Sequence, residues 1–392
     1  MRATFAGVRR GPYNATVMLS ATPDQLANWY EVANVDEIAS PALLVYLERV
    51  DENIRDMIGV AGGVARLRPH VKTHKLPEMI RRQLVLGIDK FKCATIAEAE
   101  MLAECGCPDV LLAYQPVGPN IHRLSELAVR YPATSFSAVV DDEGIARRLS
   151  EAFSRTGRAI ELLVDLDCGM HRSGISPGDA PALYALLARL PGIAPGGLHA
   201  YDGHIRDADI NARAGVSDAA FEPVARLRRE LEASGLRVPR VVVGGTPTFP
   251  IHARRAGVEV SPGTCIFWDA GYDSQLPDLP FRPAALVLTR VVSRPGGNRL
   301  CLDLGHKAIA SENPHPRVQL LNLPDATPVM HSEEHLVVET PHAAHFAVGD
   351  ACYGVPWHIC PTVALYGAAI VVDRHTATAS WRIVARERAL TV

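Results

Sequence analysis

The chain has 392 residues, of which 48% are hydrophobic and 21% are charged, the composition of an ordinary globular protein. This composition excludes a collagen-like, coiled-coil or disordered chain, and the length predicts about two domains. The 40 basic residues nearly balance the 43 acidic residues, so the net charge is −3. A balance of this kind gives no basic patch for nucleic acid or for an acidic membrane surface, and we expect neither partner.

No apolar stretch is long enough for a membrane helix. The longest ones, such as Ala285–Val292, are far shorter than the ~20 residues that a bilayer requires. The basic segment Met1–Tyr13 is not followed by an apolar segment, which argues against a secretory signal. The eight cysteines are scattered and form no C-x-x-C pair, so we expect reduced thiols rather than disulfides. Together these features favour a cytoplasmic protein.

In the middle of the chain, short apolar or β-branched runs alternate with helix-like segments. The eight predicted strands are Arg66–Lys72, Lys90–Thr95, Val110–Tyr114, Ser135–Val140, Ile160–Asp167, Gly197–Tyr201, Arg240–Gly244 and Val258–Ser261. The helix-like segments are Ile96–Cys105, Asp142–Arg155, Ala180–Leu190 and Asp218–Ser234. This alternation predicts parallel strands joined by crossover helices. Eight such units in about 200 residues fit a closed (β/α)₈ TIM-type barrel, with an open doubly wound sheet as the alternative.

After about Tyr272 the helical periodicity disappears. Strand-like runs separated by Pro, Gly and Asn turns follow at Ala285–Ser293, Arg299–Leu304, Leu336–Glu339, Ala351–Val355 and Ala369–Asp373. This pattern predicts a second, mostly β domain. Pro41–Leu47 is an extra strand before the barrel that can join it. We therefore predict a barrel domain over residues 50–268 and a β domain built from residues 1–49 and 269–392.

The carboxyl-terminal ends of the strands hold the active site of a barrel of this kind. The first predicted strand places Lys72 at its end, and the turn Asp167–Gly169 after the fifth strand is followed by Arg172. A lysine at a barrel mouth is either a buried ion-pair member or a functional amine, and the residue alone does not decide between them. Arg172 either points back over the barrel or is an ordinary loop arginine.

Two turns of small residues follow the last two predicted strands. They are Gly244–Thr248 and Ser261–Thr264. Turns like these expose backbone N–H groups and hydroxyls, and barrels bind phosphate with them after strands seven and eight. A lysine, a phosphate cradle and a nearby arginine together suggest pyridoxal phosphate held as a Schiff base.

At this point the chain resembles a known family. The motifs Arg68–Lys75, Gly169–Gly174, Gly244–Thr248 and Pro356–Val363 resemble those of the D-threonine aldolase / D-serine dehydratase family of fold-type III, alanine racemase-like pyridoxal-phosphate enzymes. The resemblance extends from about residue 35 to the last residue. It implies a D-threonine aldolase that is active on a small D-amino acid, with a zinc-dependent D-serine dehydratase as the alternative, and it suggests a homodimer.

The resemblance also implies roles for cofactor-binding residues. Lys72 would be joined covalently to pyridoxal phosphate, Arg172 would contact its phenolate oxygen and Tyr201 would line it. The phosphate would be held by Gly245, Thr246, Gly263 and Thr264. Alanine racemases carry an arginine at the position of Ser261, facing the pyridine nitrogen. A neutral serine there implies a weaker electron sink than in a racemase.

His358 and Cys360 form a candidate metal pair. On an extended strand, residues two apart face the same way, and an imidazole with a thiolate favours Zn²⁺. A His and a Cys two positions apart more often have a structural role. This pair, however, resembles the zinc-binding His and Cys of D-serine dehydratases. Bacterial D-threonine aldolases more often carry Asp at the second position and use Mn²⁺ or Mg²⁺, whereas Phe267–Tyr272 looks more aldolase-like. The metal is therefore Zn²⁺, Mn²⁺ or Mg²⁺.

The hypothetical mechanism needs a base for the substrate's β-hydroxyl, for which His204 and His70 are the candidates. Either can equally be an orienting hydrogen-bond partner. A non-catalytic cofactor carrier and an alanine racemase stay open as other functions. The pair in the β domain argues against a carrier, and Ser261 argues against a racemase. The histidines His306, His331 and His335 receive no role.

Overall fold

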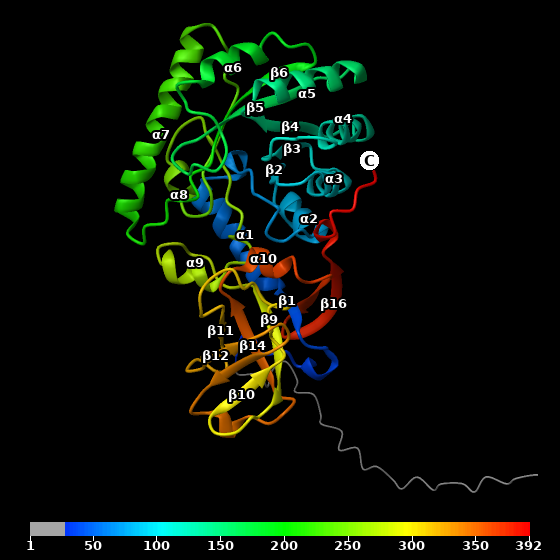
Figure 1. Cartoon of the computed structure of the whole chain (residues 1–392), viewed down its shortest axis with the longest axis vertical. Helices are drawn as coiled ribbons and strands as arrows, with labels where there is room; N and C mark the ends of the chain where they lie inside the picture. Colours follow the sequence, from blue (N-terminus) through cyan, green and yellow to red (C-terminus); the bar gives the residue numbers. More distant parts are fainter. Residues whose placement is uncertain (1–27) are drawn as a thin grey trace, which may run out of the picture.

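The computed structural model of the protein describes residues 28–392. The predictions for Met1–Tyr13 and for the first part of the β domain lie outside these described residues. A barrel of strands and helices, drawn from blue to green, adjoins a β-rich part drawn from yellow to red (Figure 1). None of the helices in the described range combines the length and the apolar character needed to cross a membrane.

The barrel contains a seven-stranded parallel sheet whose strands follow one another in chain order. They are β2 (Lys90–Cys93), β3 (Asp109–Leu112), β4 (Ser135–Val140), β5 (Ile160–Leu166), β6 (Ile193–Ala200), β7 (Val241–Val243) and β8 (Glu259–Val260). Each corresponds to one of the predicted strands, and the predicted alternation with helices is confirmed.

The first predicted strand, Arg66–Lys72, is too irregular to form a ladder but closes the barrel. The backbone N–H of Arg68 donates to the Val260 carbonyl at 2.9 Å, and that of Lys92 donates to the Pro69 carbonyl at 2.9 Å. Pro69 has no N–H to give to a ladder, so a longer strand cannot form here. Bridges to β8 on one side and to β2 on the other join the two edges of the sheet, which excludes the open doubly wound alternative.

Helices pack around the outside of the sheet (Figure 1). They are α1 (Leu47–Ala61), α2 (Pro77–Val85), α3 (Ile96–Glu104), α4 (Asn120–Arg130), α5 (Glu143–Thr156), α6 (Ala180–Leu187), α7 (Ile210–Ala233) and α8 (Phe249–His252). The predicted helices correspond to α3, α5, α6 and α7. Helix α7 begins earlier than predicted because the side chain of Asp209 caps it by accepting from the N–H groups of Asn211 and Ala212.

The interior of the barrel is layered, because inward-facing residues recur at every second position of a strand. An apolar layer fills the middle and consists of Leu111, Val139, Leu163 and Val242. On β5, Glu161 lies two positions before Leu163 and Asp165 two positions after it. The same strands therefore place charged side chains at both ends of the barrel, with the apolar layer between them.

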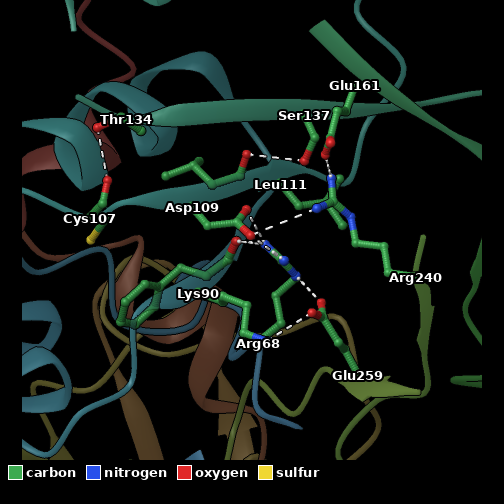
Figure 2. Close-up of polar contacts among 12 residues, drawn as sticks. Arg68, Lys90, Cys107, Asp109, Leu111, Thr134, Ser137, Glu161, Arg240 and Glu259 are labelled. Carbon is green, nitrogen blue, oxygen red and sulfur yellow. Dashed lines mark hydrogen bonds and ion pairs between the residues drawn. The ribbon is translucent and has the colours of Figure 1, made fainter. Parts of the chain in front are cut away.

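At the amino-terminal end, buried Arg68 bridges two carboxylates (Figure 2). It forms two bonds of 2.7 Å to Asp109 and one of 2.7 Å to Glu259. Burial alone would raise the pKa of both carboxyls, but the hydrogen bonds and charge of Arg68 hold each pKa below its usual range. Both carboxylates therefore stay ionised and paired.

Two further cations complete this amino-terminal network (Figure 2). The Lys90 ammonium lies 2.9 Å from Glu259. Arg240 pairs with Glu161 and lies 3.9 Å from Asp109. Every cation in this network has a carboxylate partner, as expected for an end of the barrel that stabilises the fold.

The second sheet has the strand order β12-β13-β10-β9-β1-β15-β16, with β14 pairing with β9 and β11. The strands are β1 (Ala42–Tyr46), β9 (Ala285–Ser293), β10 (Arg299–Leu302), β11 (Val318–Leu320), β12 (Thr327–His331), β13 (Leu336–Glu339), β14 (Ala351–Pro356), β15 (Ala368–Asp373) and β16 (Thr376–Arg382). Strand β1 pairs with β9 and β15, so segments from before and after the barrel share this sheet. The exact domain boundaries stay a prediction.

The last residues return to the barrel, where the red end of the chain lies beside α3 and α4 (Figure 1). The Thr391 N–H donates to the Glu100 carboxylate at 3.1 Å, and Arg130 donates to the Thr391 carbonyl at 2.9 Å. The short helix α10 (Ile359–Val363) follows β14. Its Ile359 and Val363 are buried in the core cluster of the barrel, so α10 carries the residues beside it to the barrel mouth.

Candidate functional site

A cavity of about 1060 Å³ lies at the carboxyl-terminal ends of the barrel strands. Every predicted site residue except His204 lines it: His70, Lys72, Arg172, Tyr201, Gly245, Thr246, Gly263, Thr264, His358 and Cys360. These residues come from segments that follow several barrel strands and from the start of α10. Folding thus brings the predicted lysine, the predicted phosphate turns and the predicted metal pair to one place.

Three cations, Lys72, Lys92 and Arg172, lie over the Tyr201 ring in this cavity, and two of them were predicted. The Lys72 Nζ is 5.9 Å and the Arg172 guanidinium carbon is 4.9 Å from the ring centroid. The ion pairs formed by the described residues include neither of these two cations, whereas neighbouring Lys75 is paired with Glu98. An amine and a guanidinium without carboxylate partners form an attractive site for an anion.

The two predicted phosphate turns are joined by Thr246. Its Oγ1 accepts hydrogen bonds from the N–H groups of Gly263 and Thr264, each at 3.1 Å. A Cβ on Gly245 would lie 2.8 Å from a ring carbon of Tyr201, so only glycine leaves room for the aromatic ring here. Thr246 thus holds the two turns together at the strand ends, where small residues and the buried Thr246 and Thr264 side chains line the cavity and leave room for a phosphate.

The residues that line the cavity fit pyridoxal phosphate. An amine without an ion-pair partner among residues 28–392 suits an aldehyde, an aromatic ring suits a planar heterocycle, and two adjoining turns of small residues suit a phosphate. Ser261, where racemases carry arginine, is buried and lines the cavity, and its hydroxyl donates to the Arg68 carbonyl at 3.0 Å. The position that would face the ring nitrogen is therefore neutral in this chain.

The structure adds a buried charged relay that the sequence analysis missed. The Lys92 Nζ lies 3.4 Å from His199 Nε2, and His199 Nδ1 lies 2.6 Å from an Asp165 carboxylate oxygen. Burial, followed by the nearby charge of Lys72, lowers the pKa of Lys92 to about 7. The signal was present in the sequence, because Lys92 and Asp165 occupy inward-facing positions once the barrel is assumed.

The two predicted base candidates lie in different surroundings. The Nδ1 of His70 accepts from the Lys72 backbone N–H at 3.2 Å. Burial, together with the charge of Lys72, lowers the pKa of His70 well below its usual range, so its imidazole is neutral at physiological pH. His204 is exposed, lies against Gly169 and does not line the cavity. The structure brings only His70 to the site.

The predicted strand around His358 and Cys360 is wrong. Strand β14 ends at Pro356, His358 is extended, and helix α10 begins at Ile359, so Cys360 lies in the first turn of a helix. Both side chains nevertheless line the cavity, and the Cys360 sulfur lies 3.1 Å from the Thr73 hydroxyl.

His358 and Cys360 stabilise each other's charged forms, an imidazolium and a thiolate, and a metal would take the place of the imidazolium proton. Burial would raise the pKa of the Cys360 thiol, but its hydrogen bond to His358 and the charge of His358 lower it. Burial would lower the pKa of His358, but Cys360 and Glu312 raise it to about 9. A thiolate beside an imidazole is a donor pair that Zn²⁺ prefers. Within residues 28–392 no group of three or more His, Cys, Asp or Glu side chains is arranged to hold a metal.

Comparison with known proteins follows the two halves of the fold. Residues 45–270 match the family model of the alanine racemase N-terminal domain, and residues 284–372 match that of a serine dehydratase domain. The chain is 32% identical over 364 residues to the D-threonine aldolase of an Arthrobacter species, covering 91% of this chain and 94% of that protein. It is 30% identical over 365 residues to a 3-hydroxy-D-aspartate aldolase of Paracoccus denitrificans, covering 89% and 92%.

A solved structure agrees with these matches. The crystal structure of D-threonine aldolase from Filomicrobium marinum superposes with a TM-score of 0.84 at 30% identity, covering 90% of this chain and 97% of that chain. The similarity includes both the barrel and the β-rich part. It therefore extends over the segments that meet at the cavity.

Proposed function

Because this chain belongs to the D-threonine aldolase / D-serine dehydratase family of fold-type III, alanine racemase-like pyridoxal-phosphate enzymes, we propose that it is a metal-activated D-threonine aldolase. It would cleave D-threonine, or a related D-3-hydroxy amino acid, to glycine and an aldehyde. One observation carries the proposal: the amine of Lys72, which has no ion-pair partner within residues 28–392, shares a cavity with the two predicted phosphate turns and with His358 and Cys360.

The cofactor would be held by residues of the barrel. Lys72 would carry it covalently, Arg172 and Tyr201 would contact its ring, and the phosphate would lie in the two turns of small residues (Gly245, Thr246, Gly263 and Thr264). Pyridoxal phosphate, when bound, supplies an electron sink for the bonds at the substrate's α-carbon. The unpaired cations support this assignment, because they match the negative charges of a phosphate and a phenolate.

The metal would be held by His358 and Cys360 at the start of α10. A divalent ion there supplies a Lewis acid that lowers the pKa of the substrate's β-hydroxyl. Two protein ligands leave coordination positions for substrate and water. The thiolate favours Zn²⁺, whereas the similarity to aldolases keeps Mn²⁺ and Mg²⁺ as candidates.

The protein's proton transfers decide the product. Transfer of the β-hydroxyl proton to a base would let the Cα–Cβ bond break with release of an aldehyde, and return of a proton to the α-carbon would give glycine. Transfer of the α-proton to Lys72, with departure of the hydroxyl as water, would leave an unsaturated amino acid, and its hydrolysis by water would give a 2-oxo acid and ammonia. The contacts of His70 favour an orienting role over a role as the base. Its Nδ1 accepts from the Lys72 N–H, and a neutral ring then carries its proton on Nε2 and has no free nitrogen to accept another. A catalytic role for His204 stays a prediction.

The second candidate is a zinc-dependent D-serine dehydratase. It is favoured by Cys360, whose thiolate suits zinc, and by the match of residues 284–372 to a serine dehydratase domain. The same lysine and the same metal pair would serve both reactions. The difference lies only in which proton is removed.

The products separate the candidates. We expect purified enzyme, supplied with pyridoxal phosphate and a divalent metal, to release equal amounts of glycine and acetaldehyde from D-threonine. Pyruvate and ammonia from D-serine, without aldehyde from D-threonine, would replace the aldolase by the dehydratase. Racemisation of D-alanine, or binding of the cofactor with no turnover, would reject both.

We further propose a homodimer in the cytoplasm, with the β domain of one subunit near the barrel of the other. Exposed apolar Tyr114 and Val117 at the edge of the cavity support such an interface. All eight cysteines are free, which supports a reducing compartment. Light scattering on the purified holoenzyme would test the dimer, for which a monomeric mass is the contrary result.

A further inference from the structure

We propose that Glu312 is a positioning residue that fixes the tautomer and the ring orientation of His358 for metal binding. The carboxylate lies at the cavity, where it faces the imidazole from a different segment of the chain. This inference rests on the metal site of the proposed function. It adds a residue that belongs to none of the motifs on which that function was predicted.

The contact is short and directional. Glu312 Oε1 lies 2.5 Å from His358 Nδ1 and also accepts from the Asn313 amide at 3.0 Å. A carboxylate can only accept, so His358 Nδ1 must carry the hydrogen. A metal that displaces the proton of Nε2 therefore finds its lone pair on that atom, the only one that the ring can offer while Nδ1 donates to Glu312. Side chains around metal sites commonly orient a histidine in this way, through a carboxylate, a histidine and then the metal.

The loop that carries Glu312 is anchored at the residue that follows Glu312 and again at Arg317. Arg317 donates through Nε to the Asn313 carbonyl at 2.8 Å, and its own carbonyl accepts from Trp357 N–H at 2.8 Å. Trp357 immediately precedes His358. The backbone of the loop is therefore tied both to itself and to the segment that holds the metal pair.

Two of the histidines without an assigned role complete this anchor. The Arg317 guanidinium lies 3.2 Å from His306 Nε2 and 3.0 Å from His331 Nδ1, and His331 Nε2 contacts the Leu304 carbonyl at 3.0 Å. These contacts tie the loop to the second sheet. The His306 and His331 imidazoles therefore have a structural role, which is to hold the Arg317 guanidinium in position.

The other side of His358 is fixed by α10. The buried carboxylate of Asp269 accepts from Ile359 N–H at 3.1 Å and from Tyr272 N–H at 2.9 Å. The backbone after His358 is thereby held, and Glu312 sets the remaining freedom of the ring. Removing the Glu312 carboxylate leaves the ring free to rotate and to change tautomer without loss of either metal ligand.

The experiment measures metal affinity on the holoenzyme rather than turnover. Competition with a chromophoric chelator gives the affinity for Zn²⁺ and for Mn²⁺. We expect Glu312→Ala and Glu312→Gln to weaken Zn²⁺ binding by about 10–100-fold, with Glu312→Asp weakened less. Glu339→Gln is the matched control, because Glu339 forms a surface pair with Arg299 in the second sheet; we expect it to bind as the unmodified chain does.

A spectroscopic readout separates positioning from general loosening of the fold. In ¹⁵N-histidine NMR of the Zn²⁺-loaded enzyme, His358 should show a protonated Nδ1, and Glu312→Ala should show a changed or mixed tautomer. Wild-type affinity and an unchanged tautomer in Glu312→Ala, while His358→Ala loses the metal, would overturn this inference alone. Undiminished Zn²⁺ binding in His358→Ala would overturn the metal site of the proposed function and this inference with it.

Discussion

At the amino-terminal end of the barrel, buried Arg68 bonds to Asp109 and Glu259 at 2.7 Å. At the carboxyl-terminal end, Lys72 and Arg172 face the same tyrosine ring without a carboxylate partner within the described part of the chain. The two ends lie on opposite sides of one apolar layer. The difference teaches that charges on the same strands can serve stability at one end and ligand binding at the other.

The division follows from the period of a strand. On β5, Glu161 pairs with Arg240 at one end, Leu163 joins the apolar layer, and Asp165 bonds to His199 at the other end. A shift of pairing by one residue would turn all three side chains outward. The register that buries the apolar layer therefore also places both sets of charges.

The largest effect is expected from a substitution at the carboxyl-terminal end of the barrel. Under the proposed function, Lys72→Ala should abolish the imine absorbance of the bound cofactor and lower turnover by on the order of 10⁴-fold, because the protein would lose the amine proposed to carry the cofactor and to move the proton. Its urea stability should stay the same or rise, since an unpaired cation is removed. Absorbance, product assay and urea titration measure the three quantities.

Exposed Lys307, which pairs with Glu334 on the surface, gives the control for this experiment. Lys307→Ala should keep both the absorbance and the turnover. Normal turnover by Lys72→Ala would contradict the whole assignment of the cavity. A large loss of stability in that variant would contradict the comparison of the two ends.

The next largest effect is expected from a substitution at the amino-terminal end of the barrel. Arg68→Met should lower the free energy of unfolding by roughly 3 kcal/mol, because the half-buried carboxylates of Asp109 and Glu259 lose their bonds to the guanidinium and keep only their contacts to Arg240 and Lys90. In its folded state, Arg68→Met should retain the cofactor's absorbance and most of the turnover of the unmodified chain. Urea unfolding of Arg68→Met and of Arg299→Met, whose exposed pair should contribute less than about 1 kcal/mol, makes the comparison. Equal losses in the two variants would refute it.

The strand and helix pattern predicted the barrel well, since alternation is a local property of the sequence. Strands β4, β9 and β13 have the predicted bounds, and the rule that sites lie at strand ends located the cavity. Helix α10 was missed because Ile359–Val363 is short and rich in β-branched residues, and a proline in its first turn does not prevent a helix. The predicted location of the metal pair was not affected by this error, because His358 and Cys360 lie at the start of α10 and line the cavity there.

Contacts between distant segments could not be predicted from the sequence. The network around Arg68 joins residues from β3, β8 and the closing segment, and no local pattern records that pairing. Lys92 was missed for a related reason, since its role depends on facing His199, which is 107 positions away. Glu312 reaches His358 across a separation of 46 residues. Such contacts become visible only when the strands are placed around the barrel.

A smaller effect sharpens the comparison through pH. Lys92 has a pKa of about 7 in the folded protein and about 10.5 when unfolded. Between these values the unfolded state binds more protons, so the free energy of unfolding should rise with pH by at most about 1.4 kcal/mol per pH unit. Lys92→Met should remove this part of the slope.

Urea titrations of both proteins at several values between about pH 7.5 and 9.5 measure the difference in slope. The contributions of the other lysines and of the cysteines to the slope are the same in both proteins, so they cancel when one slope is subtracted from the other. Lys90→Met is the control at the paired end of the barrel, because Lys90 lies 2.9 Å from Glu259. Identical slopes for the unmodified chain and Lys92→Met would mean that Lys92 keeps an ordinary pKa.

The smallest effect concerns the phosphate turns. Thr246→Val keeps the shape of the side chain but removes the oxygen that accepts from the N–H groups of Gly263 and Thr264. Hydrogen bonds of this kind contribute about 0.5–1.5 kcal/mol each, so we expect cofactor affinity to fall by roughly tenfold as the two turns separate. Thr246→Ser restores the oxygen and should restore the affinity, measured by fluorescence on reconstitution. If valine and serine bind the cofactor equally, Thr246 does not join the turns in solution, and the cradle is held by the backbone alone.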